Sequence, residues 1–153
     1  MVISQNGLNV IKNFEGLVLR PYLDQVGVPT IGYGTTHYPG GLPVTMKDSP
    51  ISEVFAEKCL ENDLETAEYA VGKYVTSSIN QNQFDSLVDF SYNCGTGALH
   101  GSTLLRRVNA NPGDPAIRDA FMMWTKGHID GQLVIIPDLQ TRRKQEADLY
   151  FSV

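Results

Sequence analysis

Two kinds of hydrophobic pattern alternate along the chain. Apolar residues recur at helical spacing over residues 4–15, and Gly16 follows at a position that commonly ends a helix. After Ser52 the apolar residues step by three or four positions from Ala56 to Tyr74, which predicts one helix of about twenty residues. A helix of that length can span a whole domain.

Between these helices, residues 16–44 are rich in glycine and in residue types that favour strands. The glycines punctuate short runs that contain Tyr22, Val26, Val28, Ile31 and Tyr33. Asp24 and Gly27 occupy the first and fourth positions of one tight turn. The segment therefore predicts a small β region of short strands joined by tight turns.

The remainder of the chain has a helical pattern. Asn80 and Gln83 resemble a capping box at the start of one helix, and another helix is expected to begin near Ser102. Asp114, which is followed by a proline, predicts the start of a helix that Gly127 closes.

The last predicted helix begins at Asp138, after a turn at residues 130–131. Its polar face is expected to carry Arg142, Arg143 and Lys144. Together the elements predict an α+β fold: one helix, a small β-sheet and a mostly helical body.

Length and composition are those of one soluble globular domain: 153 residues, of which 42% are hydrophobic. The 12 Lys and Arg against 17 Asp and Glu give a net charge of −5, which argues against a broad nucleic-acid-binding surface. Cys59 and Cys94 lie in apolar runs and are expected to be buried thiols, with a disulfide as the alternative. No secretion signal and no membrane-spanning stretch is expected.

The sequence contains no motif typical of a metal site or of a nucleophilic serine. His37, His100 and His128 are scattered, and we expect them at the surface or as supporting residues rather than as metal ligands. No metal and no cofactor are therefore expected.

Chemistry is suggested instead by two carboxylates and a hydroxyl, those of Glu15, Asp24 and Thr30. Glu15 ends a predicted helix, where the helix dipole and apolar neighbours disfavour its negative charge. A carboxyl group that keeps its proton near neutral pH can act as a general acid. Taken singly, each residue also has a plain structural interpretation: a solvated glutamate, a turn aspartate and a strand threonine.

The spacing of the three residues, with eight positions between Glu15 and Asp24 and five between Asp24 and Thr30, resembles the catalytic triad of the phage-type lysozymes, the endolysins of glycoside hydrolase family 24. The surrounding residues are also similar to that family. They are residues 14–16, 20–24, 27–34, 80–88, 93–95 and 101–105, with Phe121, Trp124, Arg142, Arg143, Glu146 and Leu149.

The resemblance implies a lysozyme-like α+β fold in one domain, residues 1–153, with a β lobe at about 1–50 and a helical lobe at about 51–153. It implies hydrolysis of the β-1,4 bond between N-acetylmuramic acid and N-acetylglucosamine in peptidoglycan. Glu15 would be the general acid, Asp24 would stabilise positive charge or act as a base, and Thr30 would position water. Inversion is implied, but the carboxylate separation that distinguishes it from retention is a spatial quantity.

Tyr33, Tyr92 and Asn93 match cleft positions of the family, so the resemblance makes them candidates for binding glycan strands, with a core or supporting role as the alternative. Arg142 and Arg143 either face anionic stem peptides or form a solvated helical face. The family further implies a monomer made in the bacterial host cytoplasm, which reaches the cell wall through a holin-type pore and does not insert stably into a membrane.

Two other functions remain open at this point. A lytic transglycosylase cleaves the same bond with one glutamate, although Asp24 and Thr30 argue against it. A non-catalytic cell-wall-binding module could keep the same fold. The chain also departs from the family pattern: Thr35 and Thr36 follow Gly34 where a histidine is common, and the loop 127–137 has no reliable match.

Overall fold

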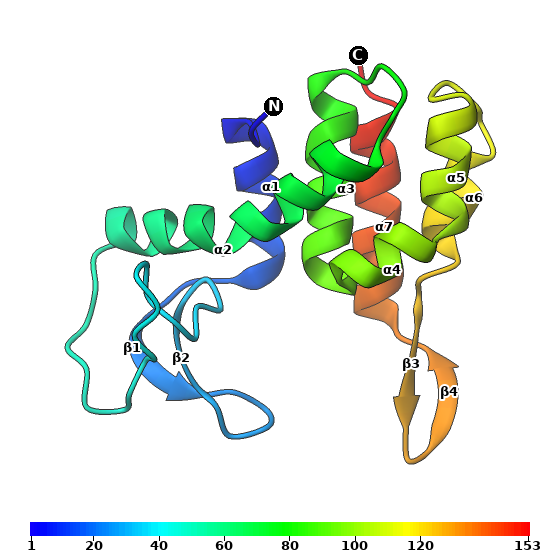
Figure 1. Ribbon diagram of the computed structural model, residues 1–153. Coiled ribbons are helices and arrows are strands. Elements are labelled where there is room, and N and C mark those ends of the chain that lie inside the picture. Colours follow the sequence, from blue (N-terminus) through cyan, green and yellow to red (C-terminus); the bar gives the residue numbers. More distant parts are fainter. The chain divides into compact units, whose positions relative to one another are not determined.

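The computed structural model describes residues 1–153, which divide into two compact units. Residues 8–65 form one unit, here called the β unit, and residues 1–7 with 66–153 form the other, the helical unit. In chain order the elements are α1 (Gln5–Glu15), β1 (Val18–Leu23), β2 (Pro29–Gly32), α2 (Glu53–Tyr74), α3 (Gln81–Cys94), α4 (Thr96–Gly101), α5 (Thr103–Ala110), α6 (Ile117–Met122), β3 (Lys126–Ile129), β4 (Gln132–Ile135) and α7 (Pro137–Tyr150) (Figure 1).

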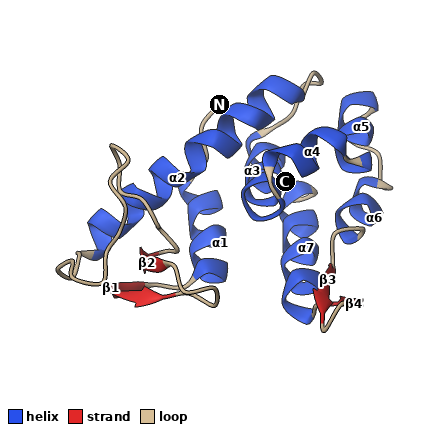
Figure 2. Cartoon of the chain, turned by 60° about the horizontal axis from the view of Figure 1, so that its bottom comes forward, coloured by secondary structure: helices blue, strands red, loops and turns tan.

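The mixed fold expected from the sequence is confirmed. Helices dominate, and the strands pair only as two short hairpins, β1 with β2 and β3 with β4 (Figure 2). Helices α1 and α2 each begin in one unit and end in the other. No helix is both long enough and apolar enough to cross a bilayer.

Helix α1 ends as predicted. Gly16 has a positive φ of 69°, and its backbone N–H donates to the carbonyl of Lys12 at 3.0 Å. Glycine adopts this left-handed conformation without a steric cost, so it closes the last helical turn. Glu15 is therefore fixed as the last helical residue.

Strands β1 and β2 are antiparallel, with Tyr22 opposite Thr30 and Leu23 opposite Pro29. The predicted turn between them is confirmed: the N–H of Gly27 donates to the carbonyl of Asp24 at 3.0 Å, and Gly27 has a φ of 84°. The strands are shorter than the apolar pattern indicates, because Val26 and Val28 belong to this turn.

The predicted long helix is α2, with 22 residues, and its apolar stripe lies in the cores of both units. In the β unit the stripe packs into a core of buried residues. That core consists of Leu8, Ile11, Ile31, Tyr33, Val44, Ala56, Cys59, Leu60 and Leu64. Cys59 and Cys94 are free thiols, so the alternative of a disulfide is wrong; Cys59 is buried, and Cys94 is half-buried.

In the helical unit α3 and α7 lie side by side (Figure 1). The predicted capping box of α3 is confirmed, because the Asn80 side chain accepts from the Gln83 N–H and the Gln83 side chain accepts from the Asn80 N–H. Edge-to-face aromatic contacts fill the core: Phe90 contacts Phe121 and Trp124, with ring centroids 5.9 Å and 5.7 Å apart.

The prediction for the helix after Asp114 is wrong at both ends. Asp114 instead opens a turn, in which its Oδ1 accepts the N–H of Ala116 at 2.9 Å and its carbonyl accepts the N–H of Ile117 at 3.0 Å, and α6 starts only at Ile117. At the other end, Trp124 lies beyond α6, and Lys126 already begins β3. Because Asp114 makes its hydrogen bonds within this turn, the helix begins three residues later, at Ile117.

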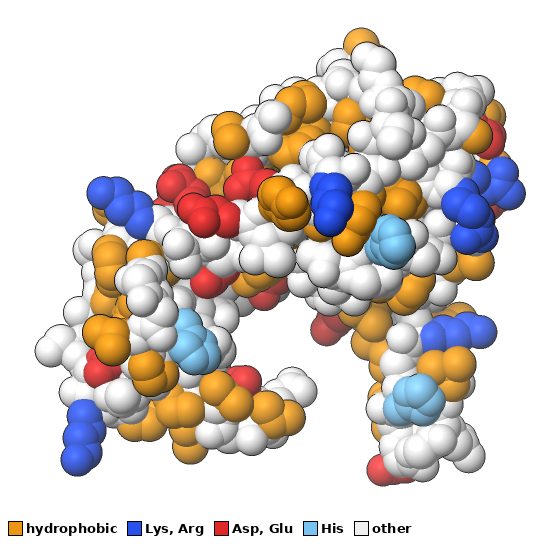
Figure 3. Space-filling model, viewed as in Figure 1, with side chains coloured by type: hydrophobic (Ala, Val, Ile, Leu, Met, Phe, Trp, Pro, Cys, Tyr) orange, Lys and Arg blue, Asp and Glu red, His pale blue; other side chains and the backbone are white.

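The β3–β4 hairpin was not predicted as strands, although the turn at residues 130–131 was. Its strands are only four residues each, too short for an alternating pattern to stand out. The hairpin exposes Ile129, Leu133 and Ile135, and Figure 3 shows hydrophobic side chains beside Lys and His along it. Because these apolar side chains face solvent, the hairpin does not show the alternation of buried apolar and exposed polar residues by which a strand is predicted.

Candidate active site

Asp24 lies directly after β1 and holds the β1–β2 turn with its own side chain. Its Oδ1 accepts the backbone N–H groups of Val26 at 2.9 Å and Val28 at 2.8 Å. The Asp24 N–H also donates to the carbonyl of Val28 at 3.0 Å. These bonds fix the carboxylate in one orientation and leave Oδ2 out of the turn.

Thr30 stands on β2 and is buried, with 3% of its surface exposed. Its hydroxyl donates to the carbonyl of Val28 at 2.8 Å. The hydroxyl proton is therefore in use, and toward any further partner Thr30 can act only as a hydrogen-bond acceptor. Asp24 and Thr30 thus share Val28 as the anchor of their side chains.

Glu15 is half-buried at the C-terminal end of α1. Backbone of the β unit approaches it closely at Gly34, where an added Cβ would lie 3.7 Å from Glu15 Oε2. Gly34 has a φ of 88°, which side chains rarely adopt, so a glycine is required here. This tight backbone conformation lets the segment after β2 pass beside the carboxyl group of Glu15.

Tyr22 lies near both carboxylates. It is half-buried on β1, directly opposite Thr30 in the ladder. Burial raises the pKa of the Tyr22 phenol, and the nearby negative charges of Asp24 and then Glu15 raise that pKa further. Both carboxylates therefore lie within electrostatic reach of one phenol. From the sequence Tyr22 is predicted only as a strand residue, although it stands two positions before Asp24.

The three predicted substrate-binding residues fall in different places. Tyr33 is in the core of the β unit, with 4% of its surface exposed, and the Lys12 ammonium lies 5.7 Å from its ring centroid. Tyr92 and Asn93 lie at the end of α3 in the helical unit, where Tyr92 is half-buried and Asn93 is exposed. Only Tyr33 shares a unit with Glu15, Asp24 and Thr30.

The expectation of a solvated face for Arg142 and Arg143 is wrong. Both side chains are buried, because α3 and α7 supply carboxylates for them. Arg142 Nη2 donates to Asp89 Oδ1 at 2.5 Å, and Arg143 donates through Nε and Nη2 to the two oxygens of Glu146, each at 2.6 Å. Burial and the charge of Asp89 raise the pKa of Glu146. Arginines three and four residues before a glutamate were the available signal for this cluster.

Cys94, at the end of α3, contacts the same cluster through Arg143. Burial raises the pKa of the Cys94 thiol to about 11, against a lowering by the charge of Arg143. A thiol that stays protonated at neutral pH is a poor nucleophile. Burial therefore favours a packing role for Cys94, as a partner of Arg143.

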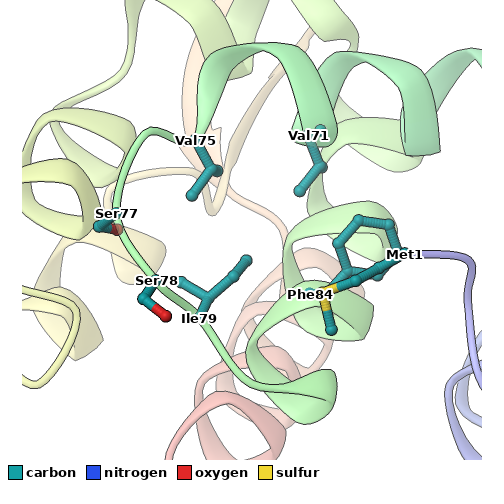
Figure 4. A pocket seen from close by; sticks show the side chains of 8 residues that line it. Met1, Val71, Val75, Ser77, Ser78, Ile79 and Phe84 are labelled. Atoms are coloured by element: carbon teal, nitrogen blue, oxygen red, sulfur yellow. The ribbon is translucent and has the colours of Figure 1, made fainter.

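A pocket of about 300 Å³ with a mixed apolar and polar lining lies in the helical unit (Figure 4). Its lining residues are Met1, Val71, Gly72, Val75, Ser77, Ser78, Ile79 and Phe84. None of them carries a titratable side chain. No group of three or more His, Cys, Asp or Glu side chains is arranged to hold a metal ion, and His37, His100 and His128 are all exposed.

The family model for phage lysozyme matches residues 12–146. The endolysin of Salmonella phage P22 is 36% identical to the chain over 99% of both proteins. The endolysin of Bacillus phage B103 is 40% identical over 99% of the chain, which spans only 55% of that longer protein.

The structural comparison agrees with the sequence comparison. A solved structure of the endolysin from Escherichia coli O157:H7 phage FAHEc1 has a TM-score of 0.92 and 40% identity, with 99% of this chain and 94% of that chain covered. Sequence and fold thus match over nearly the whole length. The chain therefore belongs to the phage lysozyme family.

Proposed function

We propose that this phage lysozyme is an endolysin muramidase that hydrolyses the β-1,4 bond between N-acetylmuramic acid and N-acetylglucosamine in bacterial peptidoglycan. Glu15 acts as general acid, Asp24 as charge stabiliser or base, and Thr30 as the residue that positions water. The geometry of the β unit supports these roles: Asp24 and Thr30 both bond to Val28, and the backbone at Gly34 passes beside the carboxyl group of Glu15.

Bond cleavage needs a proton for the leaving oxygen. Glu15 donates it while positive charge develops on the sugar ring, and the carboxylate of Asp24 stabilises that charge. Asp24 is suited to this task because the turn uses Oδ1 alone. Oδ2 then faces the ring or the attacking water.

Water attack is where Thr30 contributes. Since its hydroxyl proton is donated to Val28, Thr30 accepts a hydrogen bond from the water and directs that water's lone pair away from itself. If Asp24 takes a proton from the same water, the attack is direct and inverts the anomeric carbon. Retention would require Asp24 to form a covalent intermediate instead.

Asn93 and Tyr92 are proposed to contact the glycan strand, because their side chains reach the surface. The burial of Tyr33 favours the alternative role, in which it supports the site from within the β unit. A holin-type pore that gives access to the wall, a monomeric state and synthesis in the host cytoplasm stay predictions. So does the division into lobes at about residue 50.

The deciding experiment is mass spectrometry of the soluble fragments that the protein releases from purified peptidoglycan, with Glu15→Gln as the matched control. The amide keeps the shape of the side chain but has no acidic proton. Fragments with reducing muramic acid ends that are absent in the control support the proposal. Anhydro ends would identify a transglycosylase, and no fragments from a folded sample would indicate a binding module.

A further inference from the structure

Arg143, on α7, has a hydrogen-bond partner for every donor it carries. A guanidinium has five N–H groups. Nε and one Nη2 proton serve Glu146, the other Nη2 proton serves Asn93 Oδ1 at 2.8 Å, and Nη1 serves Cys94 Sγ at 2.7 Å and the carbonyl of Trp124 at 3.5 Å. The guanidinium also lies 5.3 Å from the centroid of the Phe90 ring.

This arrangement fixes the guanidinium in place. The side chains of Arg143 and Glu146 are both completely buried, and their pairing uses two parallel hydrogen bonds. Rotating the guanidinium would leave a buried charge without a partner, which is strongly unfavourable. The guanidinium of Arg143 is thus held in one orientation next to the C-terminal end of α3.

The fixed guanidinium decides how the Asn93 amide is oriented. Arginine has no acceptor atom, so the atom of Asn93 that faces it must be the carbonyl oxygen, Oδ1. The NH₂ group, on the opposite branch of the planar amide, then points away from Arg143. Asn93 is exposed, and its Nδ2 has no hydrogen bond to the rest of the chain.

We infer that Arg143 is a positioning residue: it holds Asn93 with its NH₂ group outward, as a hydrogen-bond donor to an acceptor oxygen of the peptidoglycan strand. The inference rests on the proposed function, because Asn93 has this partner only if the chain binds that substrate. Acetamido carbonyl groups, which every N-acetylated sugar carries, are acceptors of the required kind. A donor fixed in advance also loses little side-chain entropy on binding.

Asn93→Asp is the sharpest variant. The carboxylate keeps the size of the side chain and still accepts from Arg143, now as an ion pair, but it presents an acceptor outward where the NH₂ donor was. With soluble, uncross-linked peptidoglycan strands as substrate, KM should rise by about three- to tenfold, the worth of one hydrogen bond. The value of kcat should stay within about twofold and Tm should not fall.

Arg143→Lys tests the positioning role, because lysine cannot supply the same set of donors. KM should rise in the otherwise unchanged protein but not further in an Asn93→Ala background, since the two residues act through one contact. Phe121→Leu is the control for general loss of stability. Phe121 is buried in the same unit and packs against Phe90 and Tyr150, so this variant should lower Tm and leave KM unchanged.

An unchanged KM for Asn93→Asp would overturn the inference, and this variant is decisive even if Arg143→Lys does not fold. Additive effects of Arg143→Lys and Asn93→Ala on KM would show that Arg143 acts on KM independently of Asn93, which would overturn the positioning role. The proposed function fails separately, if the unchanged protein releases no reducing ends or if Glu15→Gln stays active. An active enzyme with a dead Glu15→Gln variant and unaffected Asn93 variants would contradict this inference alone.

Discussion

The carboxylate of Asp24 accepts the backbone N–H of Val28 at 2.8 Å, so the residue proposed to stabilise the transition state also closes the β1–β2 turn. The same Val28 offers its carbonyl to the hydroxyl of Thr30. Substitutions here can damage the turn and the chemistry together. A useful variant must therefore keep the hydrogen-bond acceptor while it removes the charge.

Asp24→Asn meets this requirement, because the amide oxygen can accept both turn N–H groups. We expect Tm close to that of the unchanged protein and turnover of peptidoglycan lower by about 10²- to 10⁴-fold, the range for a lost acid–base or charge-stabilising group. Initial rates and thermal unfolding check it. Asp24→Ala should lose stability as well, and an Asp24→Asn variant with near-normal turnover would remove Asp24 from the mechanism.

Thr30→Val keeps the shape of a buried side chain and removes only the hydroxyl. If that hydroxyl orients water, kcat should fall by about tenfold or more, while Thr30→Ser should retain most activity. The two variants are compared by steady-state rates on the same peptidoglycan preparation. Equal rates for Thr30→Val and Thr30→Ser would show that the Thr30 hydroxyl takes no part in turnover.

Arg142 and Asp89 form a buried ion pair, with side-chain exposures of 7% and 1%. Arg142→Ala leaves a carboxylate buried without its main partner, so the free energy of unfolding should fall by about 3–5 kcal/mol. Urea titration followed by circular dichroism measures this change. Lys144→Ala on the exposed face of α7 is the control, and we expect it to stay within about 0.5 kcal/mol of the unchanged protein. Equal effects of the two variants would contradict the prediction.

Ser86 is buried on α3, and its hydroxyl has no hydrogen-bond partner. Ser86→Ala removes this unsatisfied group and improves helix propensity, so it should raise the free energy of unfolding by about 1 kcal/mol. Ser102→Ala is the matched opposite, because the Ser102 hydroxyl caps α5 by accepting the Leu105 N–H at 3.0 Å. It should lower stability by about 1 kcal/mol. Denaturant midpoints that move in the same direction would refute this pair of predictions.

The raised pKa of Tyr38 predicts that the protein loses stability at alkaline pH. Burial, its hydrogen bond to Asp48 and the charge of Asp48 raise the pKa of Tyr38 to about 12, whereas an unfolded tyrosine titrates near about 10. Between these two pH values the unfolded state binds fewer protons than the folded state. The contribution of Tyr38 to stability is therefore fully present below about pH 10 and is lost as the pH rises toward about 12. Tyr38→Phe should make this decline shallower in urea titrations across the window; an unchanged slope would rule out the contribution of Tyr38.

The sequence was most informative where local rules act alone. Gly16 ended α1, the aspartate–glycine pair closed the β1–β2 turn, and Asn80 with Gln83 capped α3, because each depends on backbone geometry within a few residues. The predictions after Asp114 and at the β3–β4 hairpin were wrong or incomplete. A turn competed with a helix start in one case, and the strands were too short to show a period in the other.

Residue identity and spacing by themselves determined the family, the candidate roles of Glu15, Asp24 and Thr30, and most helix boundaries. Tertiary structure decided what depends on which distant side chains meet. It buried Arg143 at the end of α3 instead of exposing it, and it brought both carboxylates within electrostatic reach of Tyr22. A charged residue on a helix looks solvated in sequence, because only packing against another element brings the partners that make its burial favourable.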